Sequence, residues 1–342
     1  MDDQMPKDWL WCEAMLPQVS RTFALCIRFL PEDVRRPVLL SYLLCRVADT
    51  IEDAPEIAPP VKQQLLDLLA RSLDSGACDW TPVASALRDR DDADARLAAR
   101  AATVVALLQR QPPAVRAAVT TWVTEMCAGM AEFASRTAFP AGGSGMGRGL
   151  ENEHDLDRYC YFVAGTVGHL LTGVFAALRP RVKHAAPRMD ALAEDFGAGL
   201  QLVNILADVA RDRQRGVCYI PQSVCRAAGI AAHDLLRPEH RDRAREALGY
   251  LATRARQRLR RAREYCLLVP RAEYQLRLFC LIPYYLALRT LRALEQDASY
   301  PAPDQRVKIG RSAVYRTVAA ARVCAASNHL LRVYAWRLEL SV

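Results

Sequence analysis

The sequence has 342 residues, of which 51% are apolar and 25% are charged. This length and composition suit a globular protein with a substantial core and argue against a disordered or fibrous chain. The net charge of +8 favours anionic partners, namely nucleic acid, an anionic lipid surface or a diphosphate.

Helical periodicity dominates the chain. Apolar residues recur at three- and four-residue spacing in ten segments, and no convincing period-two alternation interrupts them. The predicted helical segments are 17–29, 34–53, 61–73, 94–110, 113–135, 155–178, 188–212, 239–268, 271–297 and 305–338. Prolines fall between these segments or at their edges, Pro187 among them. We therefore predict an all-α protein that forms a single domain over 1–342, because no linker long enough to divide it is present.

Two segments depart from the helical pattern. Residues 74–94 are polar, and we expect a loop with short helical turns there. Residues 140–150 hold five glycines, which predicts a mobile flap rather than a packed element. The glycine spacing superficially matches a dinucleotide fingerprint, but no predicted strand precedes it, so we do not expect a Rossmann-type site.

The sequence predicts neither a secretion signal nor a membrane span. The N-terminus is acidic and lacks a cationic stretch followed by an apolar one. The most apolar run, Leu278–Leu288, is too short to cross a bilayer and contains Pro283. Eleven cysteines are scattered singly and without metal-ligand spacing, which favours a reducing compartment. We expect a cytoplasmic protein that is soluble or peripheral to a membrane.

Much of the excess positive charge lies in the run Arg254–Arg263. A solvated helix face is the simplest interpretation, and contact with lipid or phosphate is the alternative, which would allow peripheral membrane association through this basic face. Nucleic-acid binding would instead predict tight, salt-dependent association. It would leave the acidic residues described next unexplained, so we do not expect a nucleic-acid partner.

Three carboxylates end the predicted helix 34–53. Asp49, Glu52 and Asp53 are spaced i, i+3 and i+4, so they share one helix face. Such a cluster is repulsive without a counter-cation, and its neighbours are apolar residues typical of a core. Mg²⁺ prefers carboxylate and phosphate oxygens, so we predict a metal site here, which Mn²⁺ would also suit.

A second acidic pair lies in segment 188–212. Asp208 and Asp212 are again i, i+4, and Asn204 and Gln201 lie one and two turns upstream on about the same face. A single pair of this kind is common on solvated helices. Two pairs on long apolar helices predict facing walls of one cavity, where metal ions would bridge to a diphosphate.

The surroundings of the acids support a diphosphate ligand. Arg46 precedes Asp49 by three positions and Arg21 lies in SRTF, and either is suited to bind phosphate oxygens in a bidentate manner. The remaining inward positions are apolar or aromatic. Such a pocket suits a long hydrocarbon tail and would shield a carbocation from water.

At these residues the sequence resembles the squalene/phytoene synthase family. Four blocks carry the resemblance, in consistent order between residues 17 and 315. They are SRTFAL with YLLCRVADTIED in 20–53, GMAEF in 129–133, YCYFVAGTVGHLL in 159–171 and LQLVNILADVARDRQRGVCYIP in 200–221. A fifth block, FCLIP in 279–283 followed by VKIGR in 307–311, resembles the squalene synthases of this family.

The resemblance implies an isoprenoid synthase fold, a helical bundle around a central channel in which two farnesyl diphosphates condense head to head. It implies Mg²⁺ held by the acidic residues, and NADPH for a final reduction to squalene. Tyr159 would lie near the reacting carbons and assist proton transfer or stabilise the cation, unless it only packs. The implied substrate-binding residues are Ser20, Arg21, Phe23, Tyr42, Arg46, Val163, Ala164, Gly168, Leu171, Gln201, Asn204 and Phe279. Lys308 and Arg311 would help to hold the phosphates of NADPH or to close the site, unless they only begin a basic helix.

Several positions depart from the family pattern. Ala207 precedes Asp208 where arginine is usual, so a phosphate contact is missing or is supplied by Arg211. Gly310 and Tyr284 replace a basic residue and a glutamine of eukaryotic squalene synthases, and we expect no counterpart of their C-terminal membrane anchor. The last three of these departures, at Gly310, at Tyr284 and in the anchor, fit a bacterial-type soluble squalene synthase. A phytoene, dehydrosqualene or presqualene diphosphate synthase is the alternative, as is a family member that has lost catalysis and serves as an assembly subunit.

Overall fold

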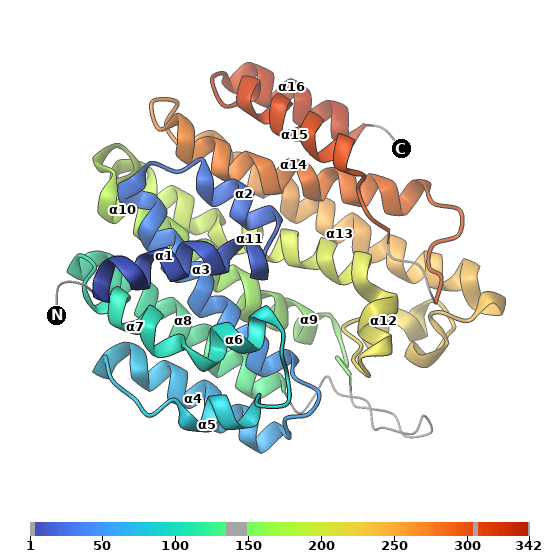
Figure 1. Ribbon diagram of the computed structural model, residues 1–342. Coiled ribbons are helices and arrows are strands. Elements are labelled where there is room, and N and C mark those ends of the chain that lie inside the picture. Colours follow the sequence, from blue (N-terminus) through green and yellow to red (C-terminus); the bar gives the residue numbers. More distant parts are fainter. Residues whose placement is uncertain (1–3, 135–148, 304–306, 341–342) are drawn as a thin grey trace. The chain divides into compact units, whose positions relative to one another are not determined.

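The computed structural model describes residues 4–134, 149–303 and 307–340. Within these residues the regular elements are helices and no strand is present, which confirms the predicted all-α fold (Figure 1). The glycine-rich segment 140–150 lies outside the described residues except for Gly149 and Leu150. The flap predicted there stays a prediction.

The chain forms two compact units, each built from two separate stretches of sequence. The first unit comprises 1–134 and 166–190, and the second comprises 135–165 and 191–342. Helix α11 (Pro180–Gln214) begins in the first unit and continues into the second without a break. The chain therefore passes between the units through a helix at this point rather than through a linker.

The helices of the first unit pack around α3. They are α1 (Gln4–Val19), α2 (Thr22–Arg28), α3 (Glu32–Asp53), α4 (Pro59–Ser75), α5 (Thr81–Ala86), α6 (Ala93–Ala99), α7 (Ala101–Gln109), α8 (Pro113–Phe133) and α10 (Thr166–Leu178). Helix α3 contacts α1, α4, α6, α7, α8 and α10, so water is removed from most of its surface. Burial of apolar side chains on this scale, rather than helix propensity, is what stabilises such a helix.

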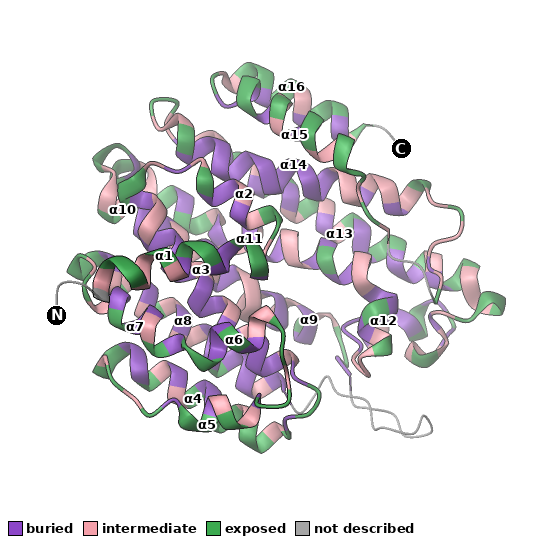
Figure 2. Cartoon of the chain, viewed as in Figure 1, coloured by how far each residue is buried: buried purple, intermediate pink, exposed green. Residues whose placement is uncertain are grey.

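The second unit is built on two long helices that pack together. Its elements are α9 (Glu153–Cys160), the end of α11, α12 (Gln222–Ala227), α13 (Arg241–Leu268), α14 (Tyr274–Gln296), α15 (Arg311–Cys324) and α16 (Asn328–Glu339). A π-helical segment, Tyr161–Gly165, follows α9. Helix α14 packs against α13 and against the hairpin of α15 and α16. Its apolar run Leu278–Leu288 is buried throughout, so this run belongs to the core (Figure 2).

Several predicted boundaries differ from the observed ones. A helix that the periodicity does not predict begins at Gln4, and the predicted segment 305–338 is two helices separated by a turn at 325–327. Segment 94–110 is divided at Arg100. Pro187, predicted at a segment edge, lies inside α11. A proline removes one backbone hydrogen bond, and the turns on either side keep this helix continuous. Helix α5 supplies the short helical turn expected within 74–94.

In the part of the chain that the structure describes, one helical stretch, Glu153–Leu178, is long and apolar enough to cross a membrane by length and composition. It consists of α9, the π-helical segment and α10. Core helices of globular proteins pass the same test, and α10 packs against α8 and α3. The stretch is therefore weak evidence for a membrane span.

Candidate functional site

The half-exposed residues at the C-terminal part of α3 form one row. Tyr42, Arg46, Asp49 and Asp53 are spaced by four, three and four residues, so their side chains lie along a single helix face. All other residues from Pro37 to Asp53 are buried. The part of α3 that a ligand can reach therefore coincides with residues that the sequence predicts to bind metal or substrate.

Two acids at the end of α3, Asp49 and Glu52, resist ionisation. Burial raises the pKa of Asp49 to about 7. The nearby charges of Asp53 and Asp94 raise this pKa further, whereas the positive charge of Arg46 lowers it. Solvent still reaches 37% of the Asp49 side-chain surface. The pKa of Glu52 is also raised, because its carboxyl group is buried and lies beside Asp53, with which it shares a hydrogen bond. A cation bound beside these groups would compensate the negative charge that the protein itself leaves in excess.

The Glu52 side chain points into the protein, unlike those of Asp49 and Asp53. Glu52 is only 7% exposed, and the ammonium group of Lys62 donates a hydrogen bond to the Glu52 backbone carbonyl. Asp49 and Asp53, in contrast, belong to the half-exposed row. The two aspartates are thus the better placed metal ligands on α3, and a metal-binding role for Glu52 stays a prediction.

Arg46 is held by an aspartate that the sequence does not single out. Its Nε and Nη2 atoms each donate to a carboxylate oxygen of Asp94, both at 2.9 Å, and its Nη1 atom lies 3.9 Å from Asp49 Oδ2. Asp94 lies in the first turn of α6. The bidentate geometry expected toward a phosphate is thus directed at Asp94 in this structure, and a phosphate-binding role for Arg46 stays a prediction. No local signal marks Asp94, because only packing of α6 on α3 brings it there.

The block SRTF lies beside Tyr42, at the N-terminal end of the α3 row. The Ser20 hydroxyl accepts a hydrogen bond from the Phe23 amide at 3.1 Å, and the Phe23 and Tyr42 rings are 5.5 Å apart. Burial raises the pKa of Tyr42 to about 12, although a hydrogen bond with Ser20 acts in the opposite direction. Arg21, next to Ser20, is exposed. The structure therefore groups Ser20, Phe23 and Tyr42, and leaves the Arg21 guanidinium accessible to an anion.

A similar row runs along α11 in the second unit. From Phe196 to Ala210 the only residues that are not buried are Leu200, Gln201, Asn204, Ala207 and Asp208. Gln201, Asn204 and Asp208 are spaced by three and four residues, and the Asn204 amide donates to Gln201 Oε1 at 3.5 Å. The Oδ1 atom of Asp208 is buried. Polar side chains thus mark the accessible stripe of a helix that is otherwise apolar.

Asp212 closes this row near the end of α11. It is 9% exposed, and its carboxylate lies 3.8 Å from Arg215 Nη1. The amides of Arg215 and Val217 both donate to its backbone carbonyl, and Gly216 adopts a positive φ of 73° that ends the helix. Arg211, the predicted substitute for an arginine at Ala207, is exposed on the same stripe.

Helix α11 packs tightly on the π-helical segment. A Cβ atom at Gly197 would lie 1.9 Å from the carbonyl oxygen of Ala164, so only glycine fits there. Single π-helical turns are frequent at functional sites. The contact holds Val163 and Ala164, two predicted substrate-binding residues, beside α11, and both remain half-exposed. Gly165 instead lies against Glu194, whose Cγ atom would be 3.1 Å from an added Cβ, so its small size serves helix packing.

Tyr159 is 4% exposed and stacks on Tyr219, with ring centroids 4.5 Å apart and an interplanar angle of 20°. Tyr219 belongs to the VCYIP sequence that follows the Asp208–Asp212 pair. The stack therefore ties α9 to the segment after α11. This contact explains the burial of Tyr159 by packing, and its role in proton transfer stays a prediction.

The remaining predicted residues occupy varied positions. Gly168 is buried and Leu171 half-buried in α10, while Phe279 is 3% exposed in α14. Lys308 and Arg311 are exposed just before and at the start of α15. Gly310 lies between them with open space around it. Tyr284 is fully buried, and its hydroxyl donates to Glu339 Oε1 at 3.4 Å, so its departure from the family pattern serves packing.

The basic run of α13 is largely neutralised within the second unit. Its arginines contact acids on α9, α11, α14 and α16: Arg254 with Glu153 and Asp157, Arg256 with Glu295, Arg258 with Asp157 and Asp195, Arg261 with Asp195, and Arg260 and Arg263 with Glu339. The run is therefore mainly an internal ion-pair network. It offers less free positive charge to lipid, phosphate or nucleic acid than the sequence predicts.

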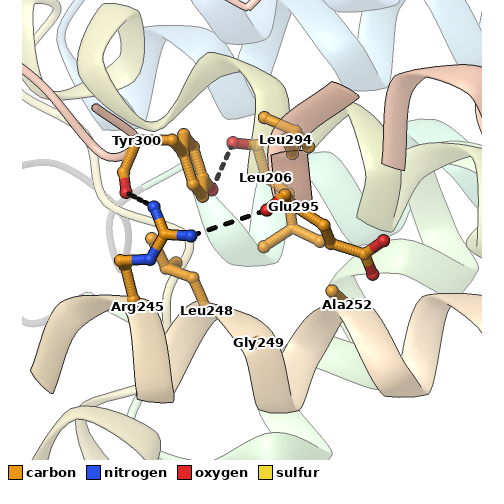
Figure 3. Close-up of a pocket in the computed structure, with 8 residues that line it drawn as sticks. All are labelled: Leu206, Arg245, Leu248, Gly249, Ala252, Leu294, Glu295 and Tyr300. Carbon is orange, nitrogen blue, oxygen red and sulfur yellow. Dashed lines mark hydrogen bonds between the residues drawn. The ribbon is translucent and has the colours of Figure 1, made fainter. Parts of the chain in front are cut away.

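A small pocket of about 140 Å³ in the second unit is lined by residues of α11, α13 and α14 and by Tyr300 (Figure 3). The polar side chains that line it are hydrogen-bonded within the protein. Arg245 donates to the backbone carbonyls of Asp297 and Tyr300 at 2.7 and 2.9 Å, and the Tyr300 hydroxyl donates to the backbone carbonyl of Leu206 at 2.8 Å. The other lining residues are Leu248, Gly249, Ala252, Leu294 and Glu295. These bonds fasten the chain after α14 to α11 and α13.

The donor chemistry of each row, taken by itself, fits a magnesium ion. Among the described residues, no three His, Cys, Asp or Glu side chains are arranged to hold an ion by themselves. Mg²⁺ usually takes one or two carboxylates and completes its octahedron with water and substrate phosphates. Accessible aspartates with a raised pKa at Asp49 suit an ion that is bound together with a diphosphate.

Comparison with known proteins gives consistent relatives. The squalene/phytoene synthase family model matches residues 16–313. Squalene synthase of Eremothecium gossypii is 28% identical over 82% of this chain and 60% of its own length. Squalene synthase of Homo sapiens is 29% identical, over 85% of this chain and 64% of its own length. The chain thus spans somewhat less than two thirds of these relatives.

Solved structures share the fold at lower identity. TcSQS in complex with a ligand superimposes with a TM-score of 0.81 at 24% identity, over 98% of this chain and 92% of that chain. A dehydrosqualene synthase in complex with a ligand gives a TM-score of 0.68 at 20% identity, over 94% and 97% of the two chains. These likenesses establish the isoprenoid synthase type of helical fold. Together with the family match over most of the sequence, they show that the chain belongs to the squalene/phytoene synthase family.

Proposed function

We propose that this protein condenses two farnesyl diphosphates head to head to presqualene diphosphate and reduces that intermediate to squalene with NADPH. The observation that carries the proposal is the pair of accessible polar rows on α3 and α11. From Pro37 to Asp53 and from Phe196 to Ala210 almost every other residue is buried, and an aspartate pair belongs to each row, with Asp212 the more buried member of its pair. Acidic rows on helices of a core have a high cost unless they serve a bound cation and its anionic ligand.

Asp49, Asp53, Asp208 and Asp212 would hold Mg²⁺ in this proposal. When bound, the ion would offset the charge that builds up on a departing diphosphate. Arg46, held by Asp94, would keep its guanidinium in a fixed orientation beside Asp49. Arg21 and Arg211 are exposed cations near the two rows and would bind the outer phosphate oxygens.

The hydrocarbon part of the substrate requires a pocket lined by side chains that cannot attack a carbocation. Val163, Ala164, Gly168, Leu171 and Phe279 would supply them, since an allylic cation survives only where water is excluded. Ionisation of the first diphosphate releases inorganic diphosphate. Attack by the alkene of the second molecule and loss of one proton then close the cyclopropane of presqualene diphosphate. The phenol of Tyr159 would take part in that proton transfer.

The reductive half-reaction rests on the VKIGR block. NADPH would supply the hydride that quenches the second cation after the second diphosphate leaves. Lys308 and Arg311 are exposed and would bind the phosphates of the cofactor. The relatives named squalene synthase support this choice over a non-reductive member of the family.

Product analysis separates the proposal from its alternatives. Purified protein is incubated with farnesyl diphosphate and Mg²⁺, with and without NADPH, and hydrocarbons are identified by mass spectrometry. We expect squalene only when NADPH is present. Dehydrosqualene or an alcohol formed regardless of NADPH would identify a non-reductive synthase. Turnover of geranylgeranyl diphosphate but not of farnesyl diphosphate would identify a phytoene synthase.

The predicted cytoplasmic location has support from the thiols. All eleven cysteines are free, and ten of them are buried. Burial raises the pKa of Cys26 and Cys266 to about 12, which keeps these thiols protonated and unreactive. Such cysteines act as small apolar core residues, which suits a reducing compartment.

A further inference from the structure

The α15–α16 hairpin concentrates the exposed apolar side chains of the protein. Nine large apolar residues are exposed among the described residues, and six of them lie between Arg311 and Leu340. These six are Tyr315, Val323, Leu330, Val333, Trp336 and Leu340. Scattered exposed apolar residues are normal, but a contiguous group marks a surface that binds a partner or a membrane.

Helix α16 is apolar on two opposite faces. Leu331, Ala335 and Leu338 are buried, as expected for a helix that packs on α13 and α14. The opposite face carries Leu330, Val333, Trp336 and Leu340 at spacings of three, three and four residues. Packing within the unit needs only the first face. The second face, with Trp336 at 57% exposure, has no partner among the described residues.

Helix α15 adds an apolar row bordered by positive charge. Tyr315, Ala319 and Val323 are spaced by four residues and exposed, with Tyr315 at 71% and Val323 at 60%. Thr317, Ala321 and Cys324 form the buried face toward α14. Because both helices bury one face against α14, their exposed faces point away from it (Figures 1 and 2).

The exposed charge of the hairpin is positive. Five arginines lie between Arg311 and Leu340, and four of them, Arg311, Arg316, Arg322 and Arg332, are exposed and have no carboxylate partner in the described part of the chain. The single acid of this stretch, Glu339, is 13% exposed at its side chain and points inward to Arg260 and Arg263. This arrangement differs from α13, whose arginines are paired internally.

We propose that the exposed face of the α15–α16 hairpin docks on an anionic lipid bilayer. Aromatic and aliphatic side chains would enter the interfacial region, where tryptophan and tyrosine are favoured, while the arginines bind lipid phosphates. The charge selects this occupant: a second copy of the hairpin would bring unpaired arginines against arginines, whereas an anionic membrane is complementary to them. The inference does not depend on the proposed reaction.

Vesicle sedimentation of the full chain tests the proposal. Vesicles of phosphatidylcholine alone are compared with vesicles that also contain phosphatidylglycerol. We expect binding to the anionic vesicles that weakens with salt, because surface charges are screened. The double substitution R316Q/R322Q should lower the partition coefficient, by about fivefold for each arginine removed. L330S/W336S should lower it at least as much on the same vesicles.

Matched controls separate the hairpin from the rest of the surface. Leu10→Ser removes a comparably exposed apolar residue of α1, and Arg88→Gln removes an exposed arginine of the first unit. Both should bind vesicles like the unmodified protein, and circular dichroism should show equal helix content in all variants. Equal loss in the controls, or no binding to anionic vesicles, would overturn the proposal. A concentration-dependent dimer that L330S/W336S abolishes, without vesicle binding, would also overturn it and assign the face to self-association.

Discussion

Asp49 and Arg46 illustrate how individual residues of the site depend on contacts far apart in sequence. The carboxyl group of Asp49 is hard to ionise because it is enclosed beside further acids, and Arg46 only partly offsets this. Arg46 itself is oriented by Asp94, which follows it by 48 residues. We infer that Asp94 is a positioning residue: it holds the guanidinium in place and does not itself touch the substrate.

Asp94→Asn should lower kcat/KM for farnesyl diphosphate about tenfold, mainly through a higher KM. One charge-assisted hydrogen bond contributes about 1.5–3 kcal/mol, and about 1.4 kcal/mol corresponds to a factor of ten. Steady-state kinetics with Mg²⁺ present measure the effect. Asp89→Asn, a change at an exposed aspartate in the same segment, is the control and should leave both constants unchanged. A lower melting temperature with unchanged KM would show that the Arg46–Asp94 pair is only structural.

The rows of acids could be predicted from sequence because they follow the period of a helix. Asp49 with Asp53, and Asp208 with Asn204 and Gln201, share faces in the structure as their spacing predicts. The partner of Arg46 could not be predicted, since nothing near Asp94 in the sequence points to α3. The inward direction of Glu52 was also beyond the pattern: the helical period groups it with Asp49, and packing of the first unit decides which of them is buried.

At the scale of elements, the contact between α11 and the π-helical segment organises the second unit's part of the site. Gly197 lets the backbone of α11 approach the carbonyl of Ala164, so the two segments touch without side chains between them. Gly249 in α13 is the opposite case. A Cβ atom there would meet nothing within 4 Å, and the residue lines the small pocket of Figure 3.

Substitution of these two glycines by alanine should change the free energy of unfolding in opposite directions. Gly249→Ala is expected to raise the free energy of unfolding by about 0.5–1 kcal/mol, because alanine has the better helix propensity and no clash arises. Gly197→Ala is expected to lower it by about 1–3 kcal/mol or more, because overpacking forces the backbones apart. Chemical denaturation monitored by circular dichroism measures both. Equal effects of the two substitutions would contradict the close packing of α11 on Tyr161–Gly165.

The periodicity of the sequence predicts where helices exist better than where they end. The predicted segment 305–338 is two helices because Ser327 caps α16, its side chain accepting from the Leu330 amide. Periodicity continues across that turn, so the break is invisible to it. The π-helical turn was equally out of reach, because periodicity does not report its close approach to Gly197, a residue more than thirty positions away in sequence.

At the scale of the whole molecule, the net charge of +8 is distributed less simply than the sequence predicts. The densest basic run, in α13, forms ion pairs with acids of its own unit. Exposed arginines without a carboxylate partner among the described residues lie instead on the α15–α16 hairpin, at Arg311, Arg316, Arg322 and Arg332. A pattern of charges in one helix cannot reveal this, because the compensating acids come from four other helices. The surface that we assign to a membrane is therefore not the one that sequence alone suggests.

The proposed reaction uses two acidic rows, one in each unit, that are separate in sequence. The first row belongs to α3 and the second to the part of α11 in the second unit. The proposed reaction requires both, because each aspartate pair would hold Mg²⁺ at the diphosphate. Loss of either pair should then be as damaging as loss of the other.

The release of inorganic diphosphate from farnesyl diphosphate, with Mg²⁺ and NADPH present, tests this claim most directly. Asp49→Asn and Asp208→Asn should each slow the release at least about a hundredfold, since a metal contributes several kcal/mol to stabilising the charge of the transition state. Asp89→Asn and Asp242→Asn, at exposed positions of the first and second unit, should keep the unmodified rate. If either Asp49→Asn or Asp208→Asn releases diphosphate as fast as these controls, the two rows do not serve one reaction.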